Sequence, residues 1–301
     1  MVDGQKIGFI GLGAMGQGMA GNLIRAGFRV VGFDLREDAR ARLAAAGGEA
    51  ARSVREAAEG AALLFLMVVN DTQVDAVLFG DEGAAAALPP GATVVLNATV
   101  PAGYVRQLGE RLDGVGRHLL DAPVSGGAIG AEKGTLTVMA SGPDAAFEAA
   151  GRALEACASR VYRLGDTPGT GSTIKAVNQL LAGVNLVTAA EGMAFGVAQG
   201  ADPKVLFEII KDAAGGSWMF SDRVPHMLDD DYTPRSAVDI WVKDLGLVLE
   251  TGKGLKMPLP MAAAAFQVVM MAAARGLGPV DDAGFVKVYE AFTGRSVASE
   301  D

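Results

Sequence analysis

The chain has 301 residues, of which 50% are hydrophobic and 20% charged. That length predicts two domains, and the composition is that of a globular protein with ample material for a core. The formal net charge is −9 and the lysines and arginines are scattered, which excludes the basic surface typical of proteins that bind nucleic acid.

Cysteine and histidine are too scarce for a disulfide framework or a zinc site. Cys157 has no partner for an intramolecular disulfide, and His118 and His226 lie far apart in the sequence. The N-terminus carries no basic leader or cleavage site, and the apolar stretches are interrupted before the roughly 20 residues that a membrane span needs. We therefore expect a cytoplasmic protein that has no metal site and no contact with a membrane.

Apolar runs alternate with helical patterns through the first half of the chain. Strands are predicted at Lys6–Ile10, Arg29–Phe33, Leu63–Val68, Thr93–Leu96, Arg117–Leu120, Thr135–Ala140 and Arg160–Arg163. Helices are predicted between them, among others at Ala14–Ala26, Glu37–Ala46 and Ala145–Ala156. Such alternation is typical of a mostly parallel sheet with helices on both faces, so we expect residues 1–164 to form a Rossmann-type, doubly wound α/β domain.

The pattern changes after Gly165, where strand candidates nearly vanish. Helices are predicted at about Ser172–Gln199, Pro203–Ala213, Ala237–Gly252, Met261–Arg275 and Ala283–Phe292. We therefore expect residues 165–301 to form an all-helical domain for substrate binding and oligomerisation. Its apolar C-terminal helices offer more surface than one small domain can bury.

A glycine-rich turn follows the first predicted strand and opens the first predicted helix. Its residues form a GxGxxG pattern: Gly11, Leu12, Gly13, Ala14, Met15 and Gly16. The glycines of such a turn permit a tight bend, a close approach of the backbone to a pyrophosphate, and close packing of helix on strand. The helix N-terminus then offers N–H groups and a partial positive charge to the diphosphate. The pattern predicts a dinucleotide cofactor.

Asp34, at the end of the second predicted strand, indicates which dinucleotide to expect. A carboxylate there can accept hydrogen bonds from the adenine ribose hydroxyls and repels a 2′-phosphate, which favours NAD. Two alternatives stay open. Arg36 could contact a 2′-phosphate if its loop turned inward, and Asp34 could be a solvated acid at a strand end.

Four ordered motifs resemble those of the β-hydroxyacid dehydrogenase family. They are Ile7–Gly16 with the following Met19–Leu23, then Asp121–Gly127, then Gly169–Gly171 leading to Lys175–Asn178, and finally Lys243–Leu245. The resemblance spans nearly the whole chain. It implies an NAD-dependent dehydrogenase that acts on the CH–OH group of a small hydroxy acid, and a homodimer or homotetramer.

The resemblance also implies roles for particular residues. Ser125, Gly126 and Gly127 would bind the substrate carboxylate, and successive glycines do expose backbone N–H groups to a ligand. The same three residues could equally form an ordinary turn.

Lys175 would be the catalytic acid and base, and Asn178, at spacing i, i+3, would share its helix face. The alternative for Lys175 is an idle surface lysine. Its apolar neighbours predict instead a largely buried helix, where an idle ammonium is costly: Ile174, Val177, Leu180 and Leu181.

Three further positions would contact the cofactor by the same resemblance. Thr99 matches a residue at the nicotinamide end, Met67 and Val68 would line the ribose side, and Lys243 would reach the cofactor from the helical domain. The preceding Asn97 and Ala98 depart from the serines usual in the family, so hydroxyl contacts are not expected from them.

A narrower resemblance, carried by Gly215–Phe220 and Tyr232–Ile240, is to the branch of the family that oxidises L-threonate to 2-oxo-threonate. Ser217, Arg223 and Asp244 would suit a polyhydroxylated substrate. Trp218 and Phe220 could equally be core aromatics. The alternatives within the family are 3-hydroxyisobutyrate dehydrogenase and tartronate semialdehyde reductase. The alternative from another class is a non-catalytic dinucleotide-binding protein, against which the presence of Lys175 argues.

Overall fold

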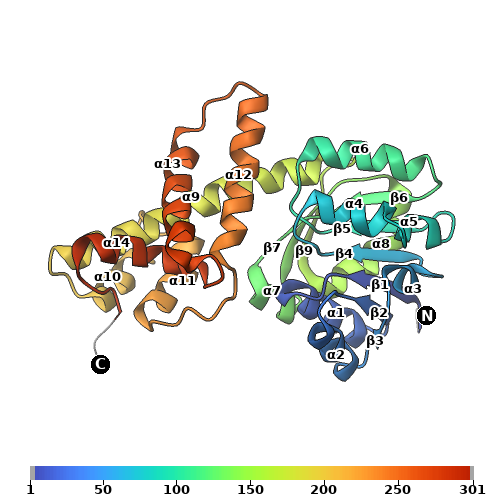
Figure 1. Cartoon of the computed structure of the whole chain (residues 1–301), viewed down its shortest axis with the longest axis horizontal. Helices are drawn as coiled ribbons and strands as arrows, with labels where there is room; N and C mark the ends of the chain where they lie inside the picture. The colour runs from blue at the N-terminus through green and yellow to red at the C-terminus, as the bar shows by residue number, and fades with distance from the viewer. Residues whose placement is uncertain (1–3, 299–301) are drawn as a thin grey trace. The chain divides into compact units, whose positions relative to one another are not determined.

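The computed structural model describes residues 4–298 of the chain. Its contacts divide the chain into two compact units, Met1–Lys175 and Ala176–Asp301. The first unit is α/β and the second is helical, as Figure 1 shows. The break between them falls inside the long helix α9 (Thr170–Ala198), so the first turn of this helix belongs with the α/β unit. The division at 164/165 that the sequence favours stays a prediction.

A six-stranded sheet, parallel throughout, forms the centre of the first unit, with strand order β3-β2-β1-β4-β5-β6. Its strands are β1 (Lys6–Ile10), β2 (Arg29–Phe33), β3 (Glu49–Ala50), β4 (Leu63–Leu66), β5 (Thr93–Leu96) and β6 (His118–Asp121). The order reverses between β1 and β4, which is the arrangement of a dinucleotide-binding Rossmann sheet. The predicted doubly wound α/β fold is confirmed.

Helices cover both faces of this sheet. They are α1 (Ala14–Arg25), α2 (Glu37–Ala45), α3 (Val54–Ala58), α4 (Asp71–Phe79), α5 (Ala84–Ala87), α6 (Ala102–Asp113), α7 (Gly127–Lys133) and α8 (Asp144–Cys157). Ile7 and Phe9 pack in one core with α1, α2 and α8, whereas Leu64 and Leu66 pack in a second core with α3 to α6. Successive strand residues point to opposite faces, so continuous apolar strands serve both cores.

A second, three-stranded sheet follows in the same unit, with order β7-β8-β9. It consists of β7 (Val124–Ser125), β8 (Leu136–Ala140) and β9 (Ala158–Arg163), and β7 pairs antiparallel with β8. The sequence predicts strands at the last two places but does not separate them from the main sheet. Alternation of strand and helix reports that a strand exists and not which strand it pairs with.

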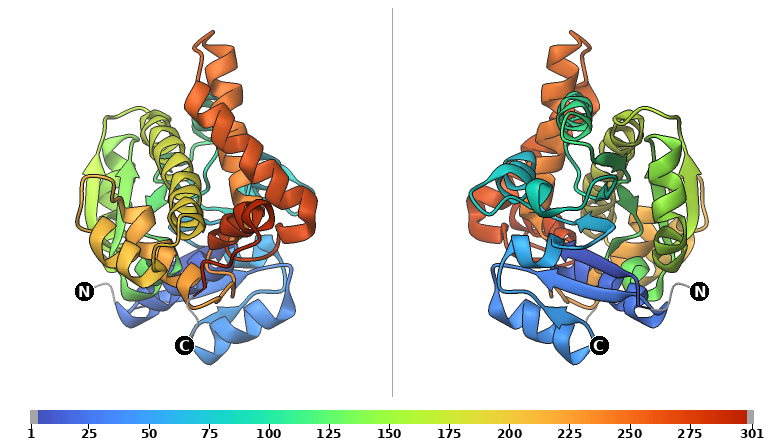
Figure 2. Two further views of the ribbon diagram at one scale, coloured as in Figure 1. Left: turned by 90° about the vertical axis from the view of Figure 1, so that its left-hand side faces the viewer. Right: turned by 90° about the vertical axis from the view of Figure 1, so that its right-hand side faces the viewer.

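The second unit is a bundle of helices around one apolar core. Its elements are the remainder of α9, then α10 (Pro203–Ile210), α11 (Trp218–Leu228), α12 (Val238–Gly254), α13 (Pro260–Ala272), the π-helical turn η1 (Ala273–Leu277), the 3₁₀ turn η2 (Asp282–Phe285) and α14 (Val286–Thr293). Helices α12 and α13 pack side by side (Figure 2). The predicted helical character of this region is confirmed, but α11 was not predicted, because Pro225 lies within it and two glycines precede it.

Two helical segments are apolar over a longer stretch than we expected from the sequence. Thr170–Ala198 and Pro260–Leu277 would pass as membrane spans by length and composition alone. The interruptions on which the expectation relied are isolated Asn, Gly and charged residues, which lower the mean hydropathy of a long helix only slightly. Core helices of soluble proteins pass the same test, so this finding is weak evidence for a membrane contact.

Candidate active site

In the glycine-rich turn between β1 and α1, Gly11 and Gly16 pack tightly against the protein backbone, whereas the space next to Gly13 is unoccupied by protein atoms. Gly11 has φ +93°, and a Cβ there would come within 2.3 Å of the carbonyl oxygen of Met67. A Cβ on Gly16 would come within 1.9 Å of the carbonyl oxygen of Gly11. At Gly13, the N-cap of α1, a Cβ would meet no protein atom within 4 Å. Because the first-turn N–H groups of α1 lack intrahelical partners, this open tip fits the diphosphate of a dinucleotide.

The predicted ribose-side residues lie beside this turn. All strands of the main sheet are parallel, so their C-terminal ends meet at one edge. The N–H of Met67 donates to the carbonyl oxygen of Ile10 at 2.9 Å, and Val68 Cγ1 lies 3.3 Å from where a Cβ on Gly11 would be. The structure thus brings Met67 and Val68 against the end of β1.

Thr99 follows β5, the strand next to β4, and is half-buried at the same edge of the sheet. Asn97, which departs from the family pattern, is buried, and its Nδ2 donates to the carbonyl oxygen of Ala122 at 2.7 Å. This bond ties the ends of β5 and β6 together, so Asn97 has a structural role in the place of a hydroxyl residue.

Asp34 lies next to the glycine-rich turn and is bonded to it. Its Oδ2 accepts from the N–H of Leu12 at 2.8 Å, and its Oδ1 accepts from the backbone N–H of Arg36 at 2.9 Å and from Arg36 Nε at 3.2 Å. Burial raises the pKa of Asp34, but the hydrogen bonds from Arg36 and Leu12 outweigh it and hold the pKa below its ordinary value. Three of about four acceptor positions of the carboxylate are therefore engaged.

The Ser125-Gly126-Gly127 segment links β7 to α7 in an unusual conformation. Gly126 has φ +128° and Gly127 has φ +63°, both in the region that favours glycine. Ser125 and both glycines are half-buried, and a Cβ on Gly127 would meet no protein atom within 4 Å. The segment leaves room for a ligand at Gly127, which is compatible with the predicted carboxylate contact.

Lys175 is buried, with 7% of its surface exposed, in the first part of α9. The predicted burial of Lys175 is therefore correct, but the apolar neighbours from which it was predicted do not explain it. Ile174, Val177 and Leu181 are 43%, 54% and 55% exposed, so the helix face that carries them is not in a core. Helical spacing placed these apolar residues on a face different from that of Lys175. The lysine is buried although its apolar neighbours are not.

Asn178 begins a chain of polar contacts within the helical unit. Its Nδ2 donates to Gln179 Oε1 at 2.9 Å, and Gln179 Nε2 donates to Asp244 Oδ2. Lys243 Nζ lies 2.7 Å from the other carboxylate oxygen of Asp244, which is buried. Asp244 thus joins Lys243 of α12 to the amide pair of α9. Sequence patterns gave Asp244 only as a possible substrate contact and did not reveal this link.

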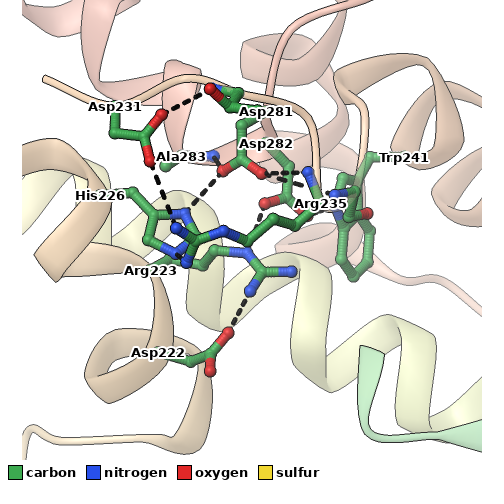
Figure 3. Close-up of polar contacts among 11 residues, drawn as sticks. Asp222, Arg223, His226, Asp231, Arg235, Trp241, Asp281, Asp282 and Ala283 are labelled. Carbon is green, nitrogen blue, oxygen red and sulfur yellow. Dashed lines mark hydrogen bonds and ion pairs between the residues drawn. The ribbon is translucent and has the colours of Figure 1, made fainter. Parts of the chain in front are cut away.

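Eight residues of the helical unit form a charged cluster, which Figure 3 shows: the buried Arg223, His226, Trp241, Asp281 and Asp282, and the partly exposed Asp222, Asp231 and Arg235. Asp282 accepts from Arg223 Nε at 2.6 Å and from Trp241 Nε1 at 2.7 Å. Burial raises the pKa of Asp282 despite these donors.

The neighbouring Asp281 lies 3.0 Å from His226 Nδ1 and accepts from the backbone N–H groups of Arg235 and Ala283. Arg235 contacts Nε2 of the same histidine. Because arginine only donates, a hydrogen bond from Arg235 to Nε2 requires the tautomer that carries its proton on Nδ1.

The structure gives Arg223 and Ser217 contacts other than the predicted substrate contacts. Arg223 is buried among its carboxylate partners, and the hydroxyl of Ser217 accepts from the N–H of Phe220 at 3.0 Å as the N-cap of α11. Arg223 is thus engaged within the helical unit and Ser217 caps a helix, and neither contact supports the predicted binding of a polyhydroxylated ligand. Phe220 is a core residue, whereas Trp218 is exposed. Within residues 4–298 no group of three or more His, Cys, Asp or Glu side chains is placed to hold a metal ion.

Both units of the chain match known dehydrogenase modules. Residues 6–165 match the NAD binding domain of 6-phosphogluconate dehydrogenase, and residues 169–289 match a family described as the NAD-binding part of NADP-dependent 3-hydroxyisobutyrate dehydrogenase.

Similar proteins extend along almost the full chain. L-threonate dehydrogenase of Cupriavidus necator is 51% identical over 285 residues, which cover 95% of this chain and 96% of the relative. L-threonate dehydrogenase of Escherichia coli K12 is 44% identical over 288 residues, 95% of each. A solved 3-hydroxyisobutyrate dehydrogenase from Salmonella typhimurium has a TM-score of 0.89 and 46% identity, and the match covers 94% of this chain and 99% of that one.

Proposed function

Since this chain belongs to the β-hydroxyacid dehydrogenase family, we propose that it oxidises L-threonate to 2-oxo-threonate. The observation that supports this choice of substrate is the 51% identity to an L-threonate dehydrogenase over 95% of the chain. The competing substrate is 3-hydroxyisobutyrate, which gives the solved relative with TM-score 0.89 its name. Reduction of tartronate semialdehyde is the other alternative within the family.

The predicted enzyme class and cofactor are confirmed: the chain is an NAD-binding dehydrogenase of hydroxy acids. The finer choice of NAD over NADP rests on Asp34. Its carboxylate, next to the glycine-rich turn, would repel a 2′-phosphate, and Arg36 is engaged by that same carboxylate. When bound, NAD accepts the hydride from the carbinol carbon of the substrate.

The protein supplies position and proton transfer. Backbone groups of Ser125, Gly126 and Gly127 hold the substrate carboxylate, and Nζ of Lys175 takes the proton from the hydroxyl oxygen as the carbon is oxidised. Asn178, one turn further along α9, orients the substrate hydroxyl. Thr99 and Lys243 contact the cofactor. A buried lysine suits this role because few water molecules compete with the substrate hydroxyl for proton exchange with Nζ.

A panel of hydroxy acids with NAD and with NADP, followed by absorbance of the reduced cofactor, tests the proposal. Glycerate, which forms when tartronate semialdehyde is reduced, represents that alternative in the oxidation direction. We expect kcat/KM for L-threonate with NAD to exceed that for 3-hydroxyisobutyrate and for glycerate by at least about tenfold, a difference of about 1.4 kcal/mol. A higher kcat/KM for 3-hydroxyisobutyrate would contradict the proposed substrate and leave the enzyme class intact.

We further propose a soluble, cytoplasmic homodimer or homotetramer that associates through the helical unit. Large apolar side chains are exposed there, which is unusual for a monomer: Phe195, Val205, Ile209, Trp218, Leu255, Met257, Met261, Met270, Met271 and Phe292. Only 22% of the most apolar window in Pro260–Leu277 is buried. A second copy of the chain would cover this surface.

Light scattering coupled to size exclusion measures the association directly. The double variant Met261→Glu/Met271→Glu should shift the wild-type dimer or tetramer towards monomer, because it places charge in the apolar surface. Val115→Glu, at an exposed apolar position of the α/β unit, is the matched control and should leave the mass unchanged. A monomeric wild type would contradict the proposal.

A further inference from the structure

Asp121 occupies a buried position that the proposed reaction does not use. It is the last residue of β6 and begins the segment that runs on to Ser125, Gly126 and Gly127. Its side chain is fully buried and accepts hydrogen bonds from two backbone N–H groups and two hydroxyls. A carboxylate without a cationic partner in this contact set is an unusual core residue, and its contacts indicate what it holds in place.

Those contacts converge on the first turn of α9. Asp121 Oδ2 accepts from the N–H of Gly169 at 2.9 Å and of Ser172 at 2.8 Å, and Oδ1 accepts from the Ser172 hydroxyl at 2.7 Å. The N–H of Gly171 donates to the hydroxyl oxygen of Ser141 at 3.0 Å, and this hydroxyl donates to Asp121 at 3.3 Å. Three N–H groups at the start of α9 are therefore satisfied by distant side chains, those of Asp121 at the end of β6 and Ser141 just after β8, in the place of a local cap.

The backbone geometry makes this attachment rigid. Asp121 and Ser141 exchange backbone hydrogen bonds of 3.0 Å and 2.8 Å, which locks β6 and the end of β8 together. A Cβ on Gly171 would come within 2.2 Å of the carbonyl oxygen of Met139, so α9 begins in direct contact with these strand ends. The first turn of the helix cannot slide along them without breaking several buried hydrogen bonds.

Lys175 is three residues beyond Ser172, on the next turn and the same face of α9. We propose that Asp121, together with Ser141, is a positioning residue of the dehydrogenase: it fixes the first turn of α9 and thereby sets Nζ of Lys175 relative to the Ser125-Gly126-Gly127 segment. The base and the carboxylate-binding segment are then both held in position by the end of β6. This inference rests on the proposed role of Lys175 as the base.

Ser172→Ala and Asp121→Asn test the proposal with little change in shape. Each removes or weakens the bond between the helix and Asp121, and a base misplaced by about 1 Å can lose up to about a hundredfold in rate. We expect kcat on the best substrate to fall at least about tenfold, with KM for NAD changed less than about twofold, since the glycine-rich turn is not touched. Thr173→Ala is the matched control, because its hydroxyl donates to the carbonyl oxygen of Gly169, just before α9, and not to Asp121, and it should keep wild-type kcat.

A double-mutant cycle separates positioning from general stability. Added to Lys175→Ala, the Ser172→Ala change should cause no further loss of kcat, because it acts through the lysine. Wild-type kcat in Ser172→Ala, or an undiminished loss in the Lys175→Ala background, would overturn the positioning role. If Asp121→Asn does not fold, the kcat of Ser172→Ala alone tests the positioning role. Full activity of Lys175→Ala itself would instead refute the proposed base, and the positioning role with it.

Discussion

The glycine-rich turn of the α/β unit and the charged cluster of the helical unit are built on opposite principles. The turn presents backbone N–H groups, and its requirements are steric: no side chain fits at Gly11 or Gly16, and none should intrude at Gly13. The charged cluster depends on side chains brought together from distant places, such as Arg223 and Asp282, which are 59 residues apart. The turn serves a ligand, whereas the cluster holds loops and helices of the unit together.

That difference determines what each region can tolerate. Removal of the Asp34 side chain beside the turn should act mainly on cofactor binding, whereas a larger residue at Gly11 or Gly16 would collide with the backbone. Substitutions at the buried members of the cluster should act on stability, because removing Arg223 or Asp282 leaves a buried partner without its opposite charge. Three predictions test this contrast.

The largest effect is expected for Arg223→Ala. Removing this guanidinium leaves Asp282 buried and without its cationic partner, which typically costs about 3–5 kcal/mol in the free energy of unfolding. Chemical denaturation measures the loss. Arg42→Ala breaks the exposed ion pair with Asp38 on α2 and should cost less than about 1 kcal/mol. Equal costs for the two variants would show that the cluster is not the stabilising element we describe.

Asp34→Ala should act on the cofactor. Without the carboxylate, a 2′-phosphate is no longer repelled and Arg36 is released to contact it, so the ratio of kcat/KM with NADP to that with NAD should rise about tenfold, or about 1.4 kcal/mol. Asp38→Ala, a nearby exposed acid on α2, should leave the ratio unchanged. A ratio unaffected by Asp34→Ala would mean that other groups select the cofactor.

The smallest effect is the pH dependence of stability from Asp281. Burial alone would raise the pKa of Asp281, but hydrogen bonds from His226 and from the backbone of Arg235 and Ala283 outweigh it and hold the pKa below its ordinary value. The folded state thus binds fewer protons than the unfolded state, and the stabilisation is present above the ordinary value of about 3.9 and is lost as pH falls through the folded pKa.

Thermal melts of wild type and Asp281→Asn from pH 6 to pH 3 test this assignment. The variant should be less stable at pH 6 and should lose less stability on acidification. Glu250→Gln, at an exposed acid of α12, should follow the wild-type slope. If the melting temperature of Asp281→Asn changed with pH as steeply as that of the wild type, Asp281 would not contribute to the loss of stability in acid.

The sequence predicted the cofactor region well for a physical reason. Buried parallel strands are continuous apolar runs, so Lys6–Ile10, Arg29–Phe33 and Thr93–Leu96 were predicted with the bounds that the structure has. The steric needs of the turn are met by glycines a fixed number of residues apart. Both signals are local in the sequence and therefore readable without a structure.

The parts that escaped prediction depend on distant partners. No spacing rule links Asp121 to Ser172, which lies 51 residues later, or Arg223 to Asp282. Proline within α11 concealed a helix that tertiary packing stabilises. The burial of Lys175 was predicted from apolar neighbours that the structure exposes, so the correct outcome had an incorrect reason.

The kcat of Lys175→Ala on the best substrate with NAD tests the central claim most directly. Acid–base catalysis by a positioned side chain contributes about 10²–10⁴ in rate, so we expect kcat to fall by that factor while NAD binding and the melting temperature stay near wild type. Lys175→Arg should recover little, because a guanidinium does not give up its proton near neutral pH. A Lys175→Ala enzyme that retains more than about a third of wild-type kcat would contradict the account, because general acid–base catalysis is worth far more than that.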